Sequence, residues 1–165
     1  MIKTPDIDAS ALLDLATYAF LRLDGAWFLA SAERYGMEAA TELDIKVWES
    51  FSERLGKKIV TTLKLKGEFP GDVPIVMKVQ NTIMNTKTEF VPVSEDKIVF
   101  RTLDCEVWKM VRKKWTSETA PCYKVTKASI SGLLRGAFPG MEFEIVQKQL
   151  IPKGDPCCEV EITKL

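Results

Sequence analysis

The chain closes on a turn followed by a strand, and this stretch reads Lys153-Gly154-Asp155-Pro156-Cys157-Cys158-Glu159-Val160-Glu161-Ile162. The Gly-Asp-Pro triplet is typical of a turn, and the strict alternation behind it is typical of a half-buried strand. Alternation sends Cys158, Val160 and Ile162 to one face of that strand and Cys157 to the other. We therefore expect the thiol of Cys158 to face the interior.

The other cysteines also stand near the ends of predicted elements. Cys105 follows a strand-like run and opens a helical run from Glu106 to Trp115, and Cys122 lies in a turn before a helix over about 126–137. A fold can bring the ends of several elements to one point. The sequence therefore raises the hypothesis that Cys105, Cys122 and Cys158 meet there.

The period of the apolar residues changes along the chain and indicates the fold class. Helical spacing predicts a helix that Asp8 caps, a break at Asp24-Gly25, a second helix that ends at Gly36, and helices over about 38–64 and 74–85. Alternation then predicts two hairpins, about Thr88–Thr102 and Glu142–Thr163, with two helices between them and Pro92 at an edge or bulge. This order predicts one α+β domain over 1–165, with a helical part over about 8–85 and a cysteine-bearing part over about 86–165. Its mainly antiparallel sheet carries helices against one face.

Length and composition are ordinary for a globular protein. A chain of 165 residues buries about 70% of its unfolded surface, and equal numbers of basic and acidic residues, 23 each, create no global field for nucleic acid or an anionic membrane. The first twenty residues lack the pattern of a signal peptide, and no apolar run is long enough to span a membrane. We expect a cytoplasmic protein that binds neither nucleic acid nor membranes, and nothing indicates a nucleotide cofactor.

The chain contains no histidine, which narrows its possible chemistry. Any metal has to be held by cysteine, carboxylate or backbone groups, so Cys105, Cys122 and Cys158 are the candidate ligands for Zn or Fe, with a carboxylate or water as the fourth ligand. No Cys-x-x-Cys spacing supports this site, and Cys158 can equally be a small buried apolar side chain. A helix start and nearby basic residues could lower the pKa of Cys105 and Cys122, which makes Cys122 the candidate nucleophile.

Three large aromatic residues lie on predicted helices. Trp27, Trp48 and Phe51 either form the core of the helical part or also line a ligand cavity between helices and sheet, because such cavities are lined mainly by apolar and aromatic groups. A basic run between Cys105 and Lys124 holds five bases against two acids. It is either a solvated helix face or a groove for an anionic group, with Lys124 as a candidate ligand contact.

Several motifs resemble a known family. The ending Leu150–Ile162 resembles the C-terminal signature of 4-vinyl-reductase-like domains. The motifs Asp104-Cys105-Glu106-Val107-Trp108, Pro121-Cys122-Tyr123-Lys124-Val125, Leu23-Asp24-Gly25-Ala26-Trp27-Phe28 and Glu42-Leu43-Asp44-Ile45-Lys46-Val47-Trp48 look more like an uncharacterised prokaryotic group beside the L-2-amino-thiazoline-4-carboxylate hydrolases.

This resemblance implies a fold shared with TRAPP-complex tethering subunits, a role in small-molecule binding or as an accessory enzyme domain, and pairing into dimers. The family cysteines fall on Cys105, Cys122 and Cys158. This chain has Leu150 where relatives commonly carry a further cysteine, which weakens the case for a metal site with four thiolates. A shared fold does not assign a reaction.

Three functions remain open at this level. The first is a small-molecule-binding domain with its cavity between helices and sheet and a cysteine-based metal or reactive-thiol site. The second is a metal- or thiol-dependent hydrolase that cleaves a C–N bond in a small heterocyclic or amide-like carboxylate. The third is a non-catalytic module that forms a homodimer through an apolar helix face.

Overall fold

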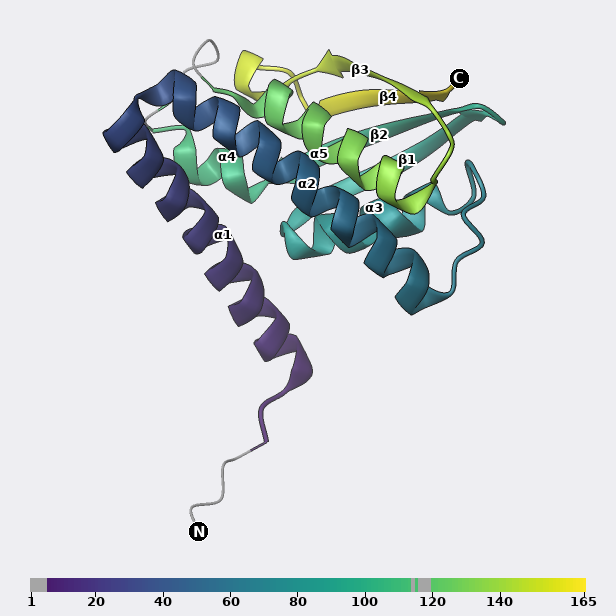
Figure 1. Ribbon diagram of the computed structural model, residues 1–165, viewed down its shortest axis with the longest axis horizontal. Coiled ribbons are helices and arrows are strands. Elements are labelled where there is room, and N and C mark those ends of the chain that lie inside the picture. Colours follow the sequence, from purple (N-terminus) through teal and green to yellow (C-terminus); the bar gives the residue numbers. More distant parts are fainter. Residues whose placement is uncertain (1–5, 114, 116–119) are drawn as a thin grey trace.

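The computed structural model describes residues 6–113, 115 and 120–165. Long helices come first, and two hairpins follow with two helices between them (Figure 1). The elements, in chain order, are α1 (Ala9–Tyr35), α2 (Met37–Leu63), α3 (Val73–Ile83), β1 (Thr86–Ser94), β2 (Lys97–Cys105), α4 (Glu106–Val111), α5 (Cys122–Ala137), β3 (Phe143–Gln149), the 3₁₀ helix η1 (Ile151–Lys153) and β4 (Cys158–Lys164).

The strands form one four-stranded antiparallel sheet in the order β1-β2-β4-β3. Each predicted hairpin is present, and β4 of the second pairs with β2 of the first. Pro92 lies in the edge strand β1 next to a register shift, where no ladder hydrogen bond from its nitrogen is needed. The α+β fold class predicted from the sequence is therefore confirmed.

The first helix differs from the prediction. Asp8 caps α1 through its carboxylate, which accepts the backbone N–H groups of Ser10 and Ala11, and Gly36 ends it. The predicted break at Asp24-Gly25 is wrong, because α1 runs through both residues. A glycine inside a helix costs only about 1 kcal/mol, and Leu21 and Phe28 are buried on either side of it.

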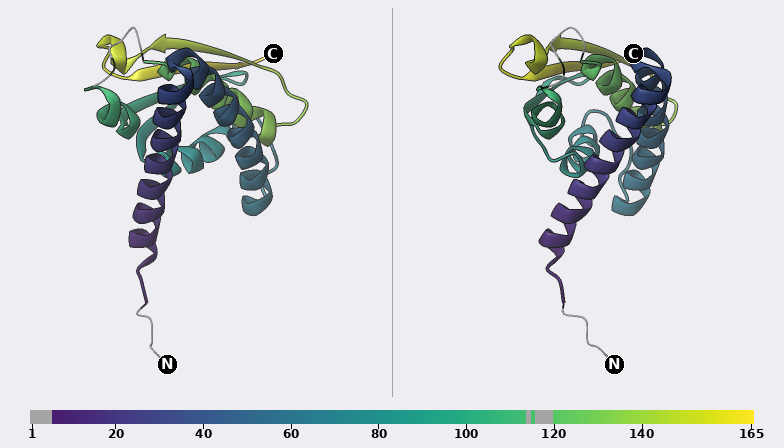
Figure 2. Two further views of the ribbon diagram at one scale, coloured as in Figure 1. Left: turned by 60° about the vertical axis from the view of Figure 1, so that its left-hand side comes forward. Right: turned by 90° about the vertical axis from the view of Figure 1, so that its left-hand side faces the viewer.

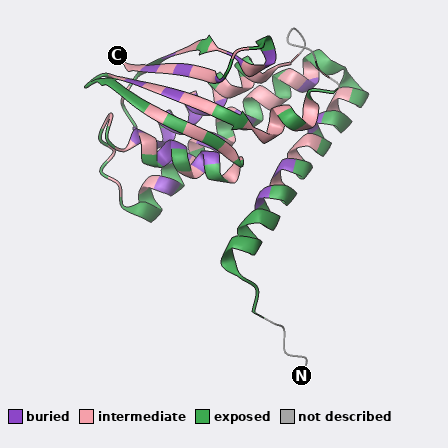
Figure 3. Cartoon of the chain, turned by 180° about the vertical axis from the view of Figure 1, so that it is seen from behind, coloured by how far each residue is buried: buried purple, intermediate pink, exposed green. Residues whose placement is uncertain are grey.

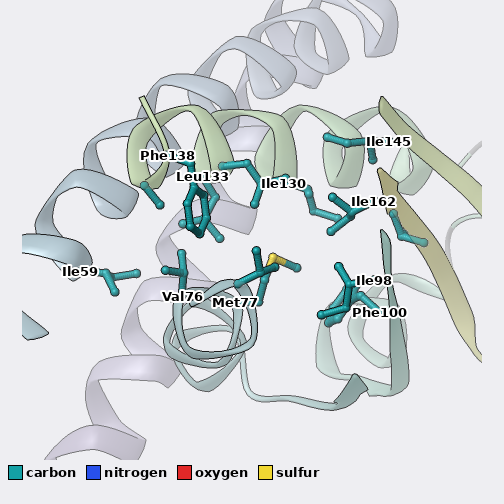
Figure 4. Close-up of a cluster of buried hydrophobic side chains, with 14 residues drawn as sticks. Ile59, Val76, Met77, Ile98, Phe100, Ile130, Leu133, Phe138, Ile145 and Ile162 are labelled. Carbon is teal, nitrogen blue, oxygen red and sulfur yellow. The ribbon is translucent and has the colours of Figure 1, made fainter. Parts of the chain in front are cut away.

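The two faces of the sheet have different environments. Ile98 and Phe100 of β2 and Ile162 of β4 are buried against α3 and α5, as the close-up of the core shows (Figure 4), and Val160 of β4 belongs to the same core. The other face carries cross-strand ion pairs, such as Lys97 Nζ to Glu161 at 2.9 Å and Arg101 Nε to Glu159 at 2.6 Å. The helices therefore cover one face only, as the alternation predicts.

Helix α2 packs very closely on α5 because glycines face the contact. A Cβ atom added to Gly132 or Gly136 would overlap the backbone carbonyl oxygens of Glu49 and Glu53, and one added to Gly56 would overlap that of Leu133. At the edge of this contact Arg135 pairs with Glu49 at 3.0 Å and with Glu53 at 2.9 Å. The apolar pattern of the sequence does not predict this contact.

The elements that carry the cysteines have shifted ends. Helix α4 stops at Val111 instead of Trp115, and α5 begins at Cys122, one turn earlier than predicted. Lys114 of the basic run and the loop residues 116–119 lie outside the described residues.

Helix α1 leaves the body of the molecule. Its N-terminal half extends away from the other elements in all three ribbon views (Figures 1 and 2), and its residues there are mostly exposed (Figure 3). None of the helices over the described part of the chain is both long and apolar enough to cross a membrane.

Candidate functional site

A cavity of about 500 Å³, called the central cavity below, lies where the helices meet the sheet. Every helix from α1 to α5 contributes to its wall, together with β2, η1 and β4. Most of the lining side chains are apolar or aromatic. They include Leu21, Phe28, Trp48, Met77, Met84, Phe100, Val107, Trp108, Met110, Val111, Trp115, Val125, Ile130, Ile151 and Val160.

The four residues predicted to contact a ligand do not all line the central cavity. Trp48 is 5% exposed and lines the cavity. Phe51 does not line it and instead packs against Phe20 and Trp48, with ring centroids 5.5 and 5.6 Å away. Trp27 is 69% exposed on the outer side of α1, and Lys124 is exposed at the start of α5. Only Trp48 of these four residues forms part of the cavity wall.

The cysteines predicted to converge all line the central cavity. Cys105 caps α4, and its sulfur accepts the backbone N–H of Trp108 at 3.4 Å. Cys122 opens α5, and Cys158 opens β4, where its sulfur accepts the N–H of Ile151 at 3.3 Å. Cys157 directly precedes β4, does not line the cavity and is buried, with its thiol donating to Gln149 Oε1 at 3.2 Å.

The pKa values of Cys105, Cys122 and Cys158 are all raised, which corrects the expectation that a helix start and basic residues lower those of Cys105 and Cys122. Burial raises the pKa of Cys122 to about 12, and repulsion between its thiolate and the ionised forms of Cys105 and Cys158 adds to the shift. Burial also raises the pKa of Cys158 to about 11 and that of Cys105 above its ordinary value. Removal of the sulfur from water therefore outweighs the effect of the helix start. All three groups are neutral thiols near pH 7.

The described residues do not show the three thiols grouped as a metal site. Among the described residues no group of three or more cysteine, aspartate or glutamate side chains is placed to hold one ion. The three sulfurs thus share a cavity without the close tetrahedral arrangement that Zn²⁺ requires. Binding of Zn or Fe by these cysteines stays a prediction.

Two carboxyl groups also line the cavity and were not predicted. Asp24 on α1 and Asp44 on α2 both face it. Burial, and then the negative charge of Asp24, raise the pKa of Asp44 to about 7, while a hydrogen bond with the Trp48 side chain acts in the opposite direction. Burial raises the pKa of Asp24 as well. These two acids lie near each other in a largely apolar wall.

A buried polar cluster forms another part of the wall. Gln80 Nε2 donates to Ser52 Oγ at 3.0 Å and to Ser129 Oγ at 2.7 Å, and the two hydroxyl groups are 3.0 Å apart. Gln80 and Ser129 line the cavity, while Ser52 lies behind them at the contact between α2 and α5. These hydrogen bonds hold the amide nitrogen of Gln80 in place.

A family model matches residues 6–154 of the chain. The chain belongs to DUF6125, a family of unknown function. The match covers α1 through η1 and includes the lining residues of the central cavity up to Pro152. No curated protein matches this DUF6125 chain by sequence.

Solved structures are similar to the DUF6125 chain in fold. One is a trafficking protein particle complex subunit 3 from Naegleria fowleri covalently bound to palmitic acid, with a TM-score of 0.65 and 14% identity over 92% of this chain and 96% of that chain. Another is the phenol-responsive sensory domain of the transcription activator PoxR with phenol, with a TM-score of 0.64 and 12% identity over 98% of this chain and 77% of that chain. The expected fold of TRAPP-complex subunits is confirmed, whereas the finer placement among 4-vinyl-reductase-like domains stays a prediction.

Sequence reasoning missed the acids of the DUF6125 chain although one signal was available. Asp44 lies four residues after Ala40 and four before Trp48, and both of these residues are buried. Spacing of four residues keeps all three on one side of α2. Asp24 gave no such signal, because its position before Gly25 suggested a helix end.

Proposed function

We propose that this protein binds a small, largely apolar molecule in the central cavity. The single observation that carries the proposal is the size of the cavity, about 500 Å³. A hollow of this size, lined mainly by apolar and aromatic groups, lies within the range of ligand-binding cavities.

Two further observations support a binding role. The wall draws on all of the helices and on the sheet, so a ligand would contact most elements of the fold. The structurally similar proteins include one bound to palmitic acid and one bound to phenol, which agrees with a fold that can enclose an apolar molecule.

The thiols do not favour the hydrolase alternative. The pKa of Cys122, about 12, keeps it protonated near pH 7, and the thiolate is the nucleophilic form. No side chain in the described ranges 6–113, 115 and 120–165 acts as a hydrogen-bonded base beside it. We therefore assign the cysteines to the wall of the binding cavity.

Gly25 offers a test that leaves the fold intact. It lines the cavity, and a Cβ added there meets nothing within 4 Å. Gly25→Phe should fill part of the cavity, while Gly25→Ala is the matched control that changes only the helix backbone. The probes are 4-phenylbutanol, 4-phenylbutylamine and 4-phenylbutyrate, and the readout is isothermal titration calorimetry with the full chain.

At least one of these probes should bind the natural protein and the Gly25→Ala variant. Gly25→Phe should weaken that binding by about 10-fold or more, because the added ring takes the place of the ligand. Equal affinity in all three proteins would locate binding elsewhere and contradict the proposal. The absence of binding for all three probes would also contradict it.

Helix α1 favours a second role, self-association, which agrees with the homodimer predicted from the sequence. Its apolar side chains are exposed over much of its length. They include Leu12, Leu13, Leu15, Tyr18, Leu23 and Trp27, with exposed fractions between 47% and 69%. Apolar patches of this kind mark interaction surfaces. A second copy of this chain is the partner we propose for them.

A further inference from the structure

The two acids of the central cavity have no cationic partner within the described chain. The ion pairs found there involve neither Asp24 nor Asp44. Arg22 lines the same cavity, but its guanidinium lies 5.1 Å from the centre of the exposed Tyr18 ring. Two neighbouring carboxyl groups in an apolar wall are unfavourable unless a cation or a proton neutralises them.

Gln80 provides an independent indication of a ligand. The side chain is 5% exposed, and its Nε2 is occupied by the two serine hydroxyl groups. Among the described residues, no group donates a hydrogen bond to its Oε1. Every fully buried side-chain oxygen and nitrogen in this part of the chain has a hydrogen-bond partner. Gln80 lines the cavity, and no described side chain or backbone group occupies this oxygen, so we take it as the acceptor for an N–H group of a ligand.

Aromatic rings stand in the same wall as these acceptors. Trp48 interacts with Asp44 directly, and Phe28 and Trp115 are in edge contact with ring centroids 5.3 Å apart. The faces of such rings attract ammonium groups, and the attraction is stronger where water is excluded. Carboxylates, an amide oxygen and tryptophan rings together suit one kind of polar group, an organic cation that carries N–H donors.

We infer that the central cavity selects molecules with an ammonium group on an apolar body, with Asp24 and Asp44 as counter-ions and Gln80 Oε1 as acceptor. This inference rests on the proposed binding function and names its ligand class. The apolar body lies against the helices and the sheet, and the ammonium group lies near Trp48, where α1 meets α2.

The pH dependence of binding follows from the acids. Below pH 7 the Asp44 carboxyl holds a proton, so a cation has to displace it and binds more weakly. Burial raises the pKa of Asp24 as well, so protonation of this second carboxyl acts in the same direction. The thiols of Cys105, Cys122 and Cys158 stay neutral because burial raises their pKa, and arginine does not deprotonate in proteins.

The test compares 4-phenylbutylamine with 4-phenylbutanol, which have the same apolar body and differ in the charged group. Calorimetry at pH 8 should show the amine binding at least about 10-fold more tightly than the alcohol. Asp24→Asn and Asp44→Asn should each reduce this preference, and Asp44→Asn should also reduce the loss of amine affinity between pH 8 and pH 6. Asp14→Asn is the matched control, because it removes the same charge from an exposed position of α1.

The possible results separate this inference from the proposed function. Equal affinity for amine and alcohol, with both blocked by Gly25→Phe, would overturn the ammonium inference and leave the binding function in place. An amine preference that survives Asp24→Asn and Asp44→Asn together would overturn the inference as well. If no probe binds, the proposed function fails and the inference fails with it.

Discussion

Asp44 shows how one side chain can serve binding at the expense of stability. It lies on α2 between the buried residues Ala40 and Trp48, and burial with the nearby charge of Asp24 raises its pKa from 3.8 to about 7. A folded pKa above the unfolded one means that the folded chain holds the proton more strongly. The contribution of this group to stability is therefore complete below about pH 4, and it is lost as the pH rises to 7.

We predict that Asp44→Asn stabilises the protein above pH 7, because asparagine carries no charge to desolvate. Part of the Asp44 side chain reaches solvent, so we expect a gain on the order of 2 kcal/mol in the free energy of unfolding at pH 8. The gain should be smaller at pH 5. Urea unfolding at both pH values measures it, and Asp14→Asn should show no such gain. A loss of stability at pH 8, or the same gain at both pH values, would contradict the assigned pKa.

The sequence pattern predicts the positions of the cysteines but not their ionisation. Their positions at the starts of α4, α5 and β4 follow from the alternation and from the turn residues before them, and the structure brings three of them to one cavity. Their ionisation could not be predicted, because it depends on how much water reaches each sulfur after folding. Chain position alone suggested low pKa values, and the packed wall reverses that direction.

At the scale of elements, the contact between α2 and α5 depends on glycine. We predict that Gly132→Ala destabilises the protein by about 2 kcal/mol or more, because the new methyl group would overlap the Glu49 carbonyl oxygen and push the helices apart. Helix propensity alone predicts the opposite sign, a gain of up to about 1 kcal/mol. Chemical denaturation measures the change, with Gly25→Ala as the control, since its Cβ meets open space. Unchanged or increased stability for Gly132→Ala would mean that α2 can move away from α5 without loss.

The glycines of α1 and α5 show which features of the helices could not be predicted from the sequence. Apolar periodicity located α2, α3, α5 and both hairpins, because each buries one face against the rest of the protein. It failed at Gly25, where local preference favours a helix end but the burial of Leu21 and Phe28 holds α1 straight through. It also missed the close approach at Gly132 and Gly136, because a residue without a side chain leaves no mark in an apolar pattern.

At the scale of the whole molecule, the projection of α1 from the body is the main feature. This helix of 27 residues is about 40 Å long at 1.5 Å per residue, and its N-terminal half leaves the body (Figures 1 and 2). Stable interfaces bury roughly 800 Å² on each partner. A projecting helix with apolar groups along its length could supply much of that area, and a two-fold arrangement would use the same surface on both copies.

We predict that the protein is a dimer at micromolar concentration and that Leu15→Glu combined with Leu23→Glu makes it monomeric. These are the most exposed leucines of α1, at 62% and 61%, so the changes place charge in the interface and disturb the packing within one copy least. Leu63→Glu, at an exposed position at the end of α2 (48%), is the matched control and should stay dimeric. Sedimentation velocity measures the state of each protein. A monomer for the natural chain would contradict self-association, and a dimer for the double variant would place the interface away from this part of α1.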